Sequence, residues 1–268
     1  MSTDTIAVPL FVPANRADRF EKAAASGADA VILDLEDAVA DQDKHEARSL
    51  LRCDFTNLPV IVRINASGSS WHEQDLAAVM SLPVAAVMLP KSEDPQRVGQ
   101  VCRALKNHAP LWALIESAQG LSGARAIAAL EGVSRLVFGS IDFCADLGCA
   151  HLPDILLPAR SELVLASRLA GIAAPIDGIT AQLENQDEIF RDACHSRALG
   201  MGGKLCVHPR QIAEVRRAFA PTEEEIDWAN RVLSSGHGAV AVDGEMVDEP
   251  VKLRARAVLA NAAKWAKK

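Results

Sequence analysis

Eight short runs of apolar residues, rich in Val, Ile and Leu, recur along most of this chain. Polar and apolar residues do not strictly alternate within them, which is the pattern of parallel strands that are covered on both faces. We therefore predict eight β-strands, at residues 6–11, 30–35, 59–64, 85–90, 111–116, 135–140, 174–179 and 204–209.

The segments between these runs have helical periodicity. Residues 17–28 and 95–107 each gather their apolar side chains on one face, and Pro95 follows Asp94 where a first turn would begin. Strands that alternate with helices over 268 residues, without a break in composition, favour one closed (β/α)8 barrel, the TIM barrel. An open doubly wound sheet is the alternative, but the GxGxxG turn that marks its nucleotide site is missing.

The barrel is expected to occupy residues 1–220, and residues 221–268 to form a C-terminal extension made of helices and a hairpin. Three elements are expected there: a helix capped by Thr222 with Glu225 three positions later, a hairpin that turns at Asp243-Gly244, and an amphipathic helix from about Glu249 to Lys267. Since this extension lies outside the count of barrel elements, we expect it to cover the barrel mouth or to reach a neighbouring subunit.

Composition excludes several classes of partner. A net charge of −7 and a pI near 5.5 argue against nucleic-acid binding. No apolar run approaches the roughly 18 residues of a membrane-spanning helix, and the N-terminus lacks the features of a signal peptide. The six cysteines are scattered without a CxxC pair, as expected for reduced thiols. We therefore expect a cytoplasmic protein with neither a membrane nor a nucleic-acid partner.

Acidic residues stand at the ends of two neighbouring predicted strands. Glu116 closes the run at 111–116, and Asp142 follows the run at 135–140. An unpaired charge is costly in a core, whereas the C-terminal ends of barrel strands carry the active sites of such folds. Two carboxylates suffice for Mg²⁺, with Mn²⁺ as an alternative, because water and substrate oxygens complete its coordination. Capping or a lysine ion pair would explain either residue alone, but not both.

A triplet of carboxylates, Asp34, Glu36 and Asp37, ends another predicted strand in VILDLEDAV. We expect these side chains to hold water molecules bound to the metal, rather than the metal itself. For Asp37, capping a helix that starts at Ala38 is at least as good an explanation.

Basic side chains also follow predicted strands. Arg63 can pair with a substrate carboxylate or stabilise an oxyanion; alternatively, it is a structural partner of Glu36 or Asp37. Lys91 could form a Schiff base, although flanking carboxylates would keep it protonated. His208 is either a base or a polar packing residue. The other histidines lack ligand spacing and are expected at the surface, among them His72, His108 and His237.

Several segments match a known pattern in order, from about Pro9 to Leu259. They are LFVPANRADRFEKAAASGADAVILDLEDAV, VRINA, MLPKSE, LIESAQGL, FGSIDFCADLG, HPRQI and MVDEP. The chain thereby resembles the citrate lyase β-subunit-like branch of the HpcH/HpaI aldolase family. The resemblance implies a (β/α)8 barrel with a C-terminal extension, a homotrimer and Mg²⁺. Such proteins make or break a carbon–carbon bond between an acyl thioester and a 2-oxo acid, as in citryl-, malyl-, methylmalyl- and citramalyl-CoA lyases.

The resemblance also implies roles for individual residues. Glu116 and Asp142 would bind the metal, Glu116 and Arg63 would contact the substrate, and Asp248 of MVDEP would be the catalytic acid/base. That aspartate would come from the extension of a neighbouring subunit. The chain is somewhat short for a dedicated citrate lyase subunit, which favours free CoA thioesters over an acyl carrier protein.

The expected activity is Mg²⁺-dependent cleavage, or formation, of a 3-hydroxyacyl-CoA to give an acyl-CoA and a 2-oxo acid. One alternative is a CoA-independent, metal-dependent pyruvate aldolase. It would keep Glu116, Asp142 and Arg63 but have no task for Asp248. Another is a non-catalytic binding subunit, against which the complete set of polar residues argues.

Overall fold

The computed structural model describes residues 3–235, 240–242 and 245–265 of the chain. The chain divides into two compact units, Met1–Arg216 and Arg217–Lys268, and each is described by itself. The expected domain boundary at residue 220 remains a prediction. So does the contribution of the C-terminal extension to the active site of a neighbouring subunit.

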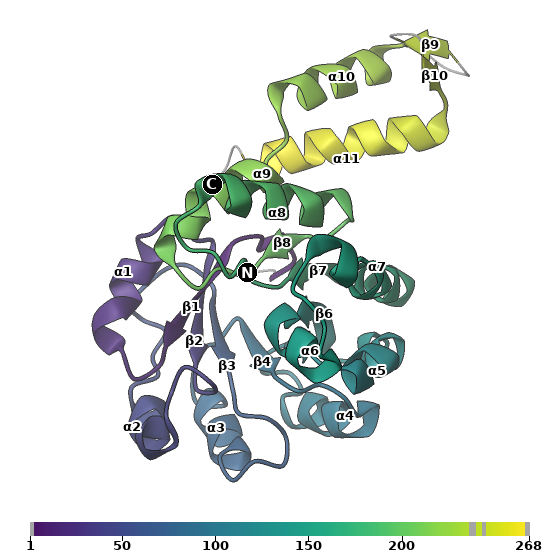
Figure 1. Ribbon diagram of the computed structural model, residues 1–268. Helices are drawn as coiled ribbons and strands as arrows, with labels where there is room; N and C mark the ends of the chain where they lie inside the picture. Colours follow the sequence, from purple (N-terminus) through teal and green to yellow (C-terminus); the bar gives the residue numbers. More distant parts are fainter. Residues whose placement is uncertain (1–2, 236–239, 243–244, 266–268) are drawn as a thin grey trace. The chain divides into compact units, whose positions relative to one another are not determined.

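The first unit is built on eight parallel strands that pair in sequence order. They are β1 (Pro9–Pro13), β2 (Ala30–Asp34), β3 (Val60–Arg63), β4 (Ala86–Leu89), β5 (Leu111–Ile115), β6 (Val133–Phe138), β7 (Ala173–Asp177) and β8 (Gly203–Lys204). Leu10 bridges in parallel to Cys206 just beyond β8, and the N–H of Phe11 donates to the carbonyl of Cys206 at 2.9 Å. The first and last strands therefore meet, and the predicted (β/α)8 barrel is confirmed (Figure 1).

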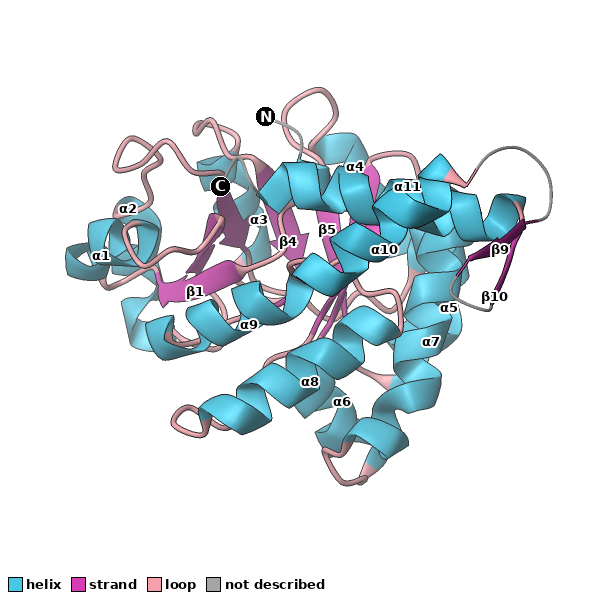
Figure 2. Cartoon of the chain, turned by 90° about the horizontal axis from the view of Figure 1, so that it is seen from above, coloured by secondary structure: helices cyan, strands magenta, loops and turns pink. Residues whose placement is uncertain are grey.

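Helices surround these strands (Figure 2). Those that begin in the first unit are α1 (Phe20–Ala24), α2 (Lys44–Ser49), α3 (His72–Val79), α4 (Pro95–Ala104), α5 (Ala118–Ala128), α6 (Ser140–Leu147), α7 (Pro153–Ala170), α8 (Gln186–Ala198) and α9 (Ile212–Phe219). Two helices, α6 and α7, lie between β6 and β7, where one was expected. Gly148 ends α6 in the left-handed conformation, with φ 65°, and Pro153 opens α7. At its other end, helix α6 starts at Ser140, and only Gly139 separates it from β6.

The strands are buried on both faces, as their unbroken apolar runs predict. Every residue of β2, β4 and β5 is buried, and Ile32, Ile61 and Trp112 belong to one hydrophobic cluster. Strand β1 starts at Pro9 rather than at residue 6. The N–H groups of Ala7 and Val8 donate to the carboxylate of Asp29, at 2.8 Å each, instead of to a neighbouring strand.

Strand β8 is shorter than predicted and is held by a buried ion cluster. Asp177, at the end of β7, accepts hydrogen bonds from Arg160 Nε at 2.9 Å and from Lys204 Nζ at 2.7 Å. Burial alone would raise the pKa of Asp177, but the charges of Lys204 and Arg160 lower it to about 2. This ionised cluster joins β7, β8 and α7.

The second unit contains α10 (Glu223–Ser234), β9 (Val240–Val242), β10 (Glu245–Val247) and α11 (Glu249–Trp265). The predicted cap is present, because Thr222 Oγ1 accepts the N–H of Glu225 and the Glu225 carboxylate accepts the N–H of Thr222. Strands β9 and β10 are antiparallel, as predicted, while the turn at Asp243-Gly244 lies outside the described residues. None of the helices in the described part of the chain is long and apolar enough to cross a membrane.

Candidate active site

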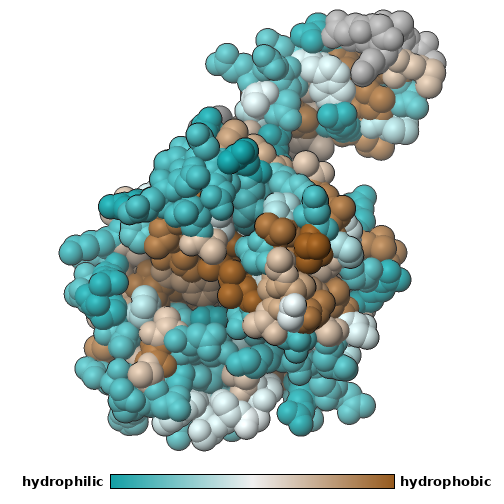
Figure 3. Space-filling view, in the orientation of Figure 1, coloured by the Kyte–Doolittle hydropathy of each residue, from teal (hydrophilic) through white to brown (hydrophobic). Residues whose placement is uncertain are grey.

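A cavity of about 410 Å³ lies at the C-terminal ends of the barrel strands. Its polar wall contains five of the residues that the sequence singled out: Asp34, Asp37, Arg63, Glu116 and Asp142. Its apolar wall includes Phe11, Leu114, Phe138 and Ile179. In the space-filling view, hydrophobic residues surround a recess near the middle of the barrel (Figure 3). An apolar pocket with a few converging polar groups is the usual form of a small-molecule site.

Glu116 follows β5 directly and is buried, with 5% of its surface exposed. Its Oε1 accepts the backbone N–H of Lys91 at 2.7 Å. The carboxylate passes over Gly139, where an added Cβ would lie 2.7 Å from Oε2 and would collide with the Glu116 Cβ. Burial, together with the charge of Glu36, raises the pKa of Glu116 to about 8. The fold thus holds a carboxylate where a nearby cation would favour its ionised form.

Asp142 lies in the first turn of α6, exposed toward the same cavity. Its negative charge contributes to the raised pKa of Glu116, and both carboxylates line the same cavity. Their oxygens form a donor set that suits a hard divalent cation. Among the described residues, no group of three or more His, Cys, Asp or Glu side chains is arranged to hold a metal ion. Mg²⁺ needs only one or two carboxylates, and these two residues fit that requirement.

Arg63 ends β3 and is held by carboxylates on one side. Its Nε and Nη2 donate to the two oxygens of Asp34 at 2.7 and 2.6 Å, and its Nη1 lies 2.9 Å from Glu36 Oε2. Burial alone would lower the pKa of Arg63, but the charge of Asp34 and of the neighbouring carboxylates raises it overall. Arg63 is therefore a structural ion-pair partner and also a fixed cation in the cavity wall.

The acidic triplet takes three different positions. Asp34 is saturated, because its oxygens also accept the N–H groups of Glu36 and Ala38 at 2.9 and 3.1 Å. Glu36 is buried between Arg63 and Lys91, and burial raises its pKa. Asp37 is 59% exposed and lies 3.8 Å from Arg63. The alternative of Asp37 as a helix cap is wrong, since the next helical segment starts at Asp41.

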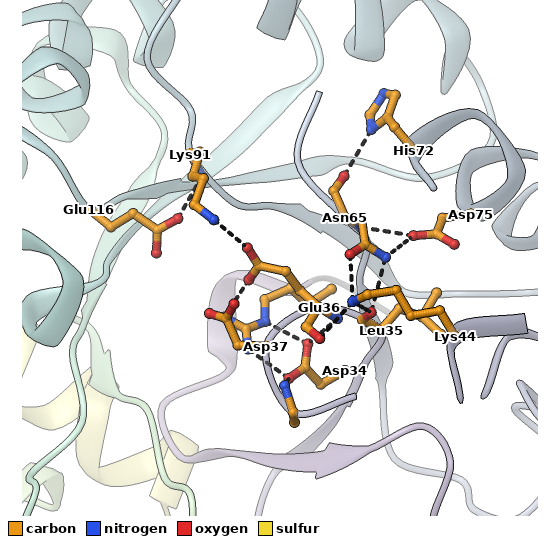
Figure 4. Close-up of polar contacts among 12 residues, drawn as sticks. Asp34, Leu35, Glu36, Asp37, Lys44, Asn65, His72, Asp75, Lys91 and Glu116 are labelled. Carbon is orange, nitrogen blue, oxygen red and sulfur yellow. Dashed lines mark hydrogen bonds and ion pairs between the residues drawn. The ribbon is translucent and has the colours of Figure 1, made fainter. Parts of the chain in front are cut away.

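A buried polar network lies beneath the loops that follow β2 and β3 (Figure 4), and it was not predicted from the sequence. The ammonium of Lys44 donates to the carbonyls of Leu35 and Glu36 and to Asn65 Oδ1, at 2.8 to 2.9 Å. Asn65 in turn donates to Asp75 through both its backbone and its side chain. The network ties the loop after β2 to the loop after β3. Lys44 and Asp75 are buried in the folded chain. Their neighbours in the sequence give no sign of this burial.

Other predicted positions lie outside the cavity wall. The ammonium of Lys91 donates to Glu36 at 3.2 Å; burial would lower the pKa of Lys91, but Glu36 raises it overall. His208 caps a short helical turn by accepting the N–H of Arg210. The expected exposure of His72 is wrong, because it is buried and its Nδ1 lies 2.9 Å from the carbonyl of Asn65. His108 is half-buried, and His237 lies outside the described residues.

Asp248 belongs to the second unit. It precedes α11, and its Oδ1 accepts the N–H of Val251 at 3.2 Å, so it serves as a helix cap there. Its role as an acid/base in the site of a neighbouring subunit stays a prediction.

Comparisons with known proteins identify the family of the chain. Residues 8–209 match the model of the HpcH/HpaI aldolase/citrate lyase family. A citrate lyase subunit beta-like protein of Deinococcus radiodurans is 38% identical, over 95% of this chain and 96% of its own. A (3S)-malyl-CoA thioesterase of Cereibacter sphaeroides is 34% identical, over 94% and 93%.

A solved structure is similar over nearly the whole chain. It is that of the protein CitE from Mycobacterium tuberculosis in complex with magnesium, acetoacetate and coenzyme A, with a TM-score of 0.87 and 36% identity. The alignment covers 97% of this chain and 99% of that one. The chain therefore belongs to the HpcH/HpaI aldolase/citrate lyase family of enzymes.

Proposed function

We propose that this protein is a Mg²⁺-dependent carbon–carbon lyase that acts on a 3-hydroxyacyl-CoA thioester. Cleavage gives an acyl-CoA and a 2-oxo acid, and the reverse reaction is a condensation. The observation that carries the proposal is the convergence of Glu116, Asp142 and Arg63 on one cavity that is otherwise largely apolar.

Glu116 and Asp142 would hold the metal through carboxylate oxygens. Their fit rests on the fixed orientation of Glu116, with one oxygen on the Lys91 amide and the other above Gly139. When bound, Mg²⁺ polarises the substrate oxygens and offsets the negative charge of the two carboxylates. Asp37, an exposed carboxylate of the cavity wall, is the member of the triplet best placed to hold a metal-bound water. Asp34 instead orients Arg63, and Glu36 joins Arg63 to Lys91.

Arg63 would stabilise the charge that develops during cleavage. The substrate hydroxyl loses its proton to a base, the bond between C2 and C3 breaks, and the electron pair passes to the thioester as an enolate. Nε and Nη2 each give one N–H to Asp34, and Nη1 is an ion-pair partner of Glu36 at 2.9 Å. The donors proposed for the oxyanion are therefore the second N–H of Nη2 and the N–H groups of Nη1. A donor that is already fixed by Asp34 needs no reorganisation when an oxyanion forms.

Asp248 would be the base that accepts the hydroxyl proton, and it would return this proton to C2 of the enolate, which completes the reaction. In this proposal the chain assembles as a homotrimer, and the second unit of one subunit brings Asp248 to the site of a neighbour. Asp248 lies between β10 and the start of α11. This position supports the proposal, because a residue at the end of a helix can be held in a fixed place.

A CoA thioester is the substrate class that this chemistry favours. The α-carbon of a thioester is acidic enough to leave as an enolate with one arginine and one carboxylate, whereas that of a free carboxylate is not. The names of the relatives support this class, because one acts on malyl-CoA and the CitE structure holds coenzyme A. The same relative also favours a second candidate, in which the thioester bond is hydrolysed.

Product analysis separates these activities. The protein would be incubated with Mg²⁺ and citryl-, malyl- or citramalyl-CoA, with the matching free acids in parallel, and the products identified by mass spectrometry. The proposal predicts acetyl-CoA plus a 2-oxo acid from at least one thioester. Free CoA plus the intact hydroxy acid would show a thioesterase instead. Equal cleavage of the free acids would support the CoA-independent aldolase.

A further inference from the structure

Lys91 has a strained backbone beside the proposed metal site. It follows β4 with φ 49°, in the left-handed region that L-amino acids other than Asn and Asp seldom occupy. Among the described residues only Asn107 is another non-glycine residue with positive φ. Strain of this kind persists where the surrounding structure imposes it, and it is frequent at functional sites.

The strained conformation directs the backbone N–H of Lys91 at a proposed metal ligand. That N–H donates to Glu116 Oε1 at 2.7 Å, and Figure 4 shows the residue between Glu116 and the acidic triplet. The other oxygen of Glu116 lies above Gly139. The hydrogen bond from Lys91 thus occupies Oε1 of Glu116 and leaves Oε2 as the oxygen proposed to bind the metal.

The side chain of Lys91 has a separate contact. Its Nζ donates to Glu36 Oε1 at 3.2 Å, and the other oxygen of Glu36 lies 2.9 Å from Arg63 Nη1. Glycine would adopt this backbone without strain. The presence of a lysine at this position therefore favours a role for its ammonium, which contacts Glu36. Lys91 lines a neighbouring cavity together with Ser67 and Arg97, and it is not part of the wall of the main one.

We propose that Lys91 is a positioning residue that couples the metal ligand to the arginine. Its backbone N–H orients Glu116 for the metal, and its ammonium keeps Glu36 against Arg63. This inference rests on the proposed function, since it gives Lys91 a task only if Glu116 binds a metal and Arg63 contacts the substrate. It assigns no covalent step to Lys91.

The backbone role is tested by metal affinity, without turnover. Mn²⁺ binding would be measured by electron paramagnetic resonance in wild type, Lys91→Gly and Lys91→Val. Glycine keeps the left-handed turn, so its Kd should stay within about threefold of wild type. The β-branched valine is driven out of that turn, so its Kd should rise about tenfold or more, as expected for losing one hydrogen bond to a charged group.

Asn107→Val is the matched control, because it places valine at the other left-handed position, after α4. It should lose thermal stability but keep the Mn²⁺ affinity of wild type. Wild-type Mn²⁺ affinity in a folded Lys91→Val protein would overturn the backbone role. Absence of Mn²⁺ binding by the wild type would instead overturn the proposed function, and this inference with it.

The side-chain role is tested by kinetics. Lys91→Met and Lys91→Gly should both lower kcat about two- to fivefold, because the ion pair with Glu36 is lost but the Lys91 side chain is 54% exposed and solvent screens such a pair. The Mn²⁺ Kd and the thioester KM should change little. Lys91→Arg should restore most of kcat, because it returns a cation to Glu36. Full kcat in Lys91→Met would overturn this role. Reduction with borohydride in the presence of the 2-oxo acid should leave Lys91 unmodified, and a trapped adduct would also overturn it.

Discussion

Asp34 and Arg63 are register partners on adjacent strands β2 and β3, and two parallel hydrogen bonds join the carboxylate to the guanidinium. The pair is largely out of solvent, with side-chain exposures of 1% and 12%. This bidentate geometry fixes the plane of the guanidinium at the cavity. The orientation of the one cation in the polar wall described above thus depends on a carboxylate that is itself fully engaged.

Asp34→Asn should destabilise the fold and weaken catalysis together. Breaking a buried ion pair costs roughly 3–5 kcal/mol, and Glu36 remains as a partner, so we expect the free energy of unfolding to fall by about 2 kcal/mol or more. Urea unfolding measures this directly. Asp37→Asn is the control, because Asp37 is exposed and 3.8 Å from Arg63. Equal stability losses in both variants would show that the Asp34 contact has no special weight.

Arg63→Lys should retain the fold but lose turnover. An ammonium cannot reproduce the planar fork that grips Asp34 and still offers donors to the cavity. The loss of such a preorganised donor reduces kcat by about 10² to 10³. Steady-state kinetics on the thioester, with Mn²⁺ affinity as a check on the metal site, measure this. A kcat within threefold of wild type would contradict the role given to Arg63.

Gly139→Ala should weaken metal binding and also lower the stability of the barrel. The added Cβ would collide with the Cβ of Glu116 and lie 2.7 Å from its Oε2. Side-chain rotation cannot relieve the first contact, so the backbone must shift and carry the carboxylate away from the position described here. Gly99→Ala is the matched control, because its Cβ would meet only flexible side chains, Arg103 and Leu130, at 3.4 and 3.8 Å. Calorimetry with Mg²⁺ compares the two variants. Unchanged affinity in Gly139→Ala would show that Glu116 does not bind the metal in this orientation.

Stability should fall in acid through Asp177. Its folded pKa of about 2 lies below the usual value near 3.9, so its contribution is complete above about pH 4 and is lost as the pH falls toward 2. Unfolding by urea at a series of pH values, in wild type and in Asp177→Asn, isolates this contribution. The stability difference between them should shrink with falling pH. A difference that stays constant would contradict an ionised Asp177 in the folded barrel.

Asp248 should act in trans. Asp248→Asn keeps an oxygen that can cap α11 but removes the carboxylate, so it should lose cleavage while retaining Mg²⁺ and 2-oxo acid binding. Mixing this variant with Arg63→Ala subunits should restore part of the activity, because some sites would draw both residues from different chains. No recovery in oligomers shown to have exchanged subunits would contradict donation between subunits.

The barrel could be predicted from the sequence because its signals are local. Apolar runs give the strands, and a proline or a cap residue marks helix starts such as those at Pro95 and Thr222. Glu116 and Asp142 stood out because each follows a complete apolar run. The short helix α6 was missed, since its first residue, Ser140, was assigned to the predicted strand and only Gly139 separates the helix from β6.

Contacts between distant residues could not be predicted in this way. Lys44 and Asp75 have ordinary sequence surroundings, and only the fold reveals that they bury charge around Asn65. The left-handed backbone of Lys91 likewise accompanies a hydrogen bond to Glu116, which lies 25 positions away. The two functions of Arg63, as ion-pair partner and as cavity cation, were posed as alternatives, and the geometry is compatible with both.

Turnover by metal-stripped protein tests most directly whether Glu116 and Asp142 hold the cation on which carbon–carbon cleavage depends. Formation of the 2-oxo acid from the CoA thioester would be followed while Mg²⁺ is added back to wild type, Glu116→Gln and Asp142→Asn. We predict no turnover before the addition, saturable recovery in wild type, and no recovery in either folded variant at the same Mg²⁺ concentrations. Full turnover by the wild type without any divalent cation would contradict the proposed function.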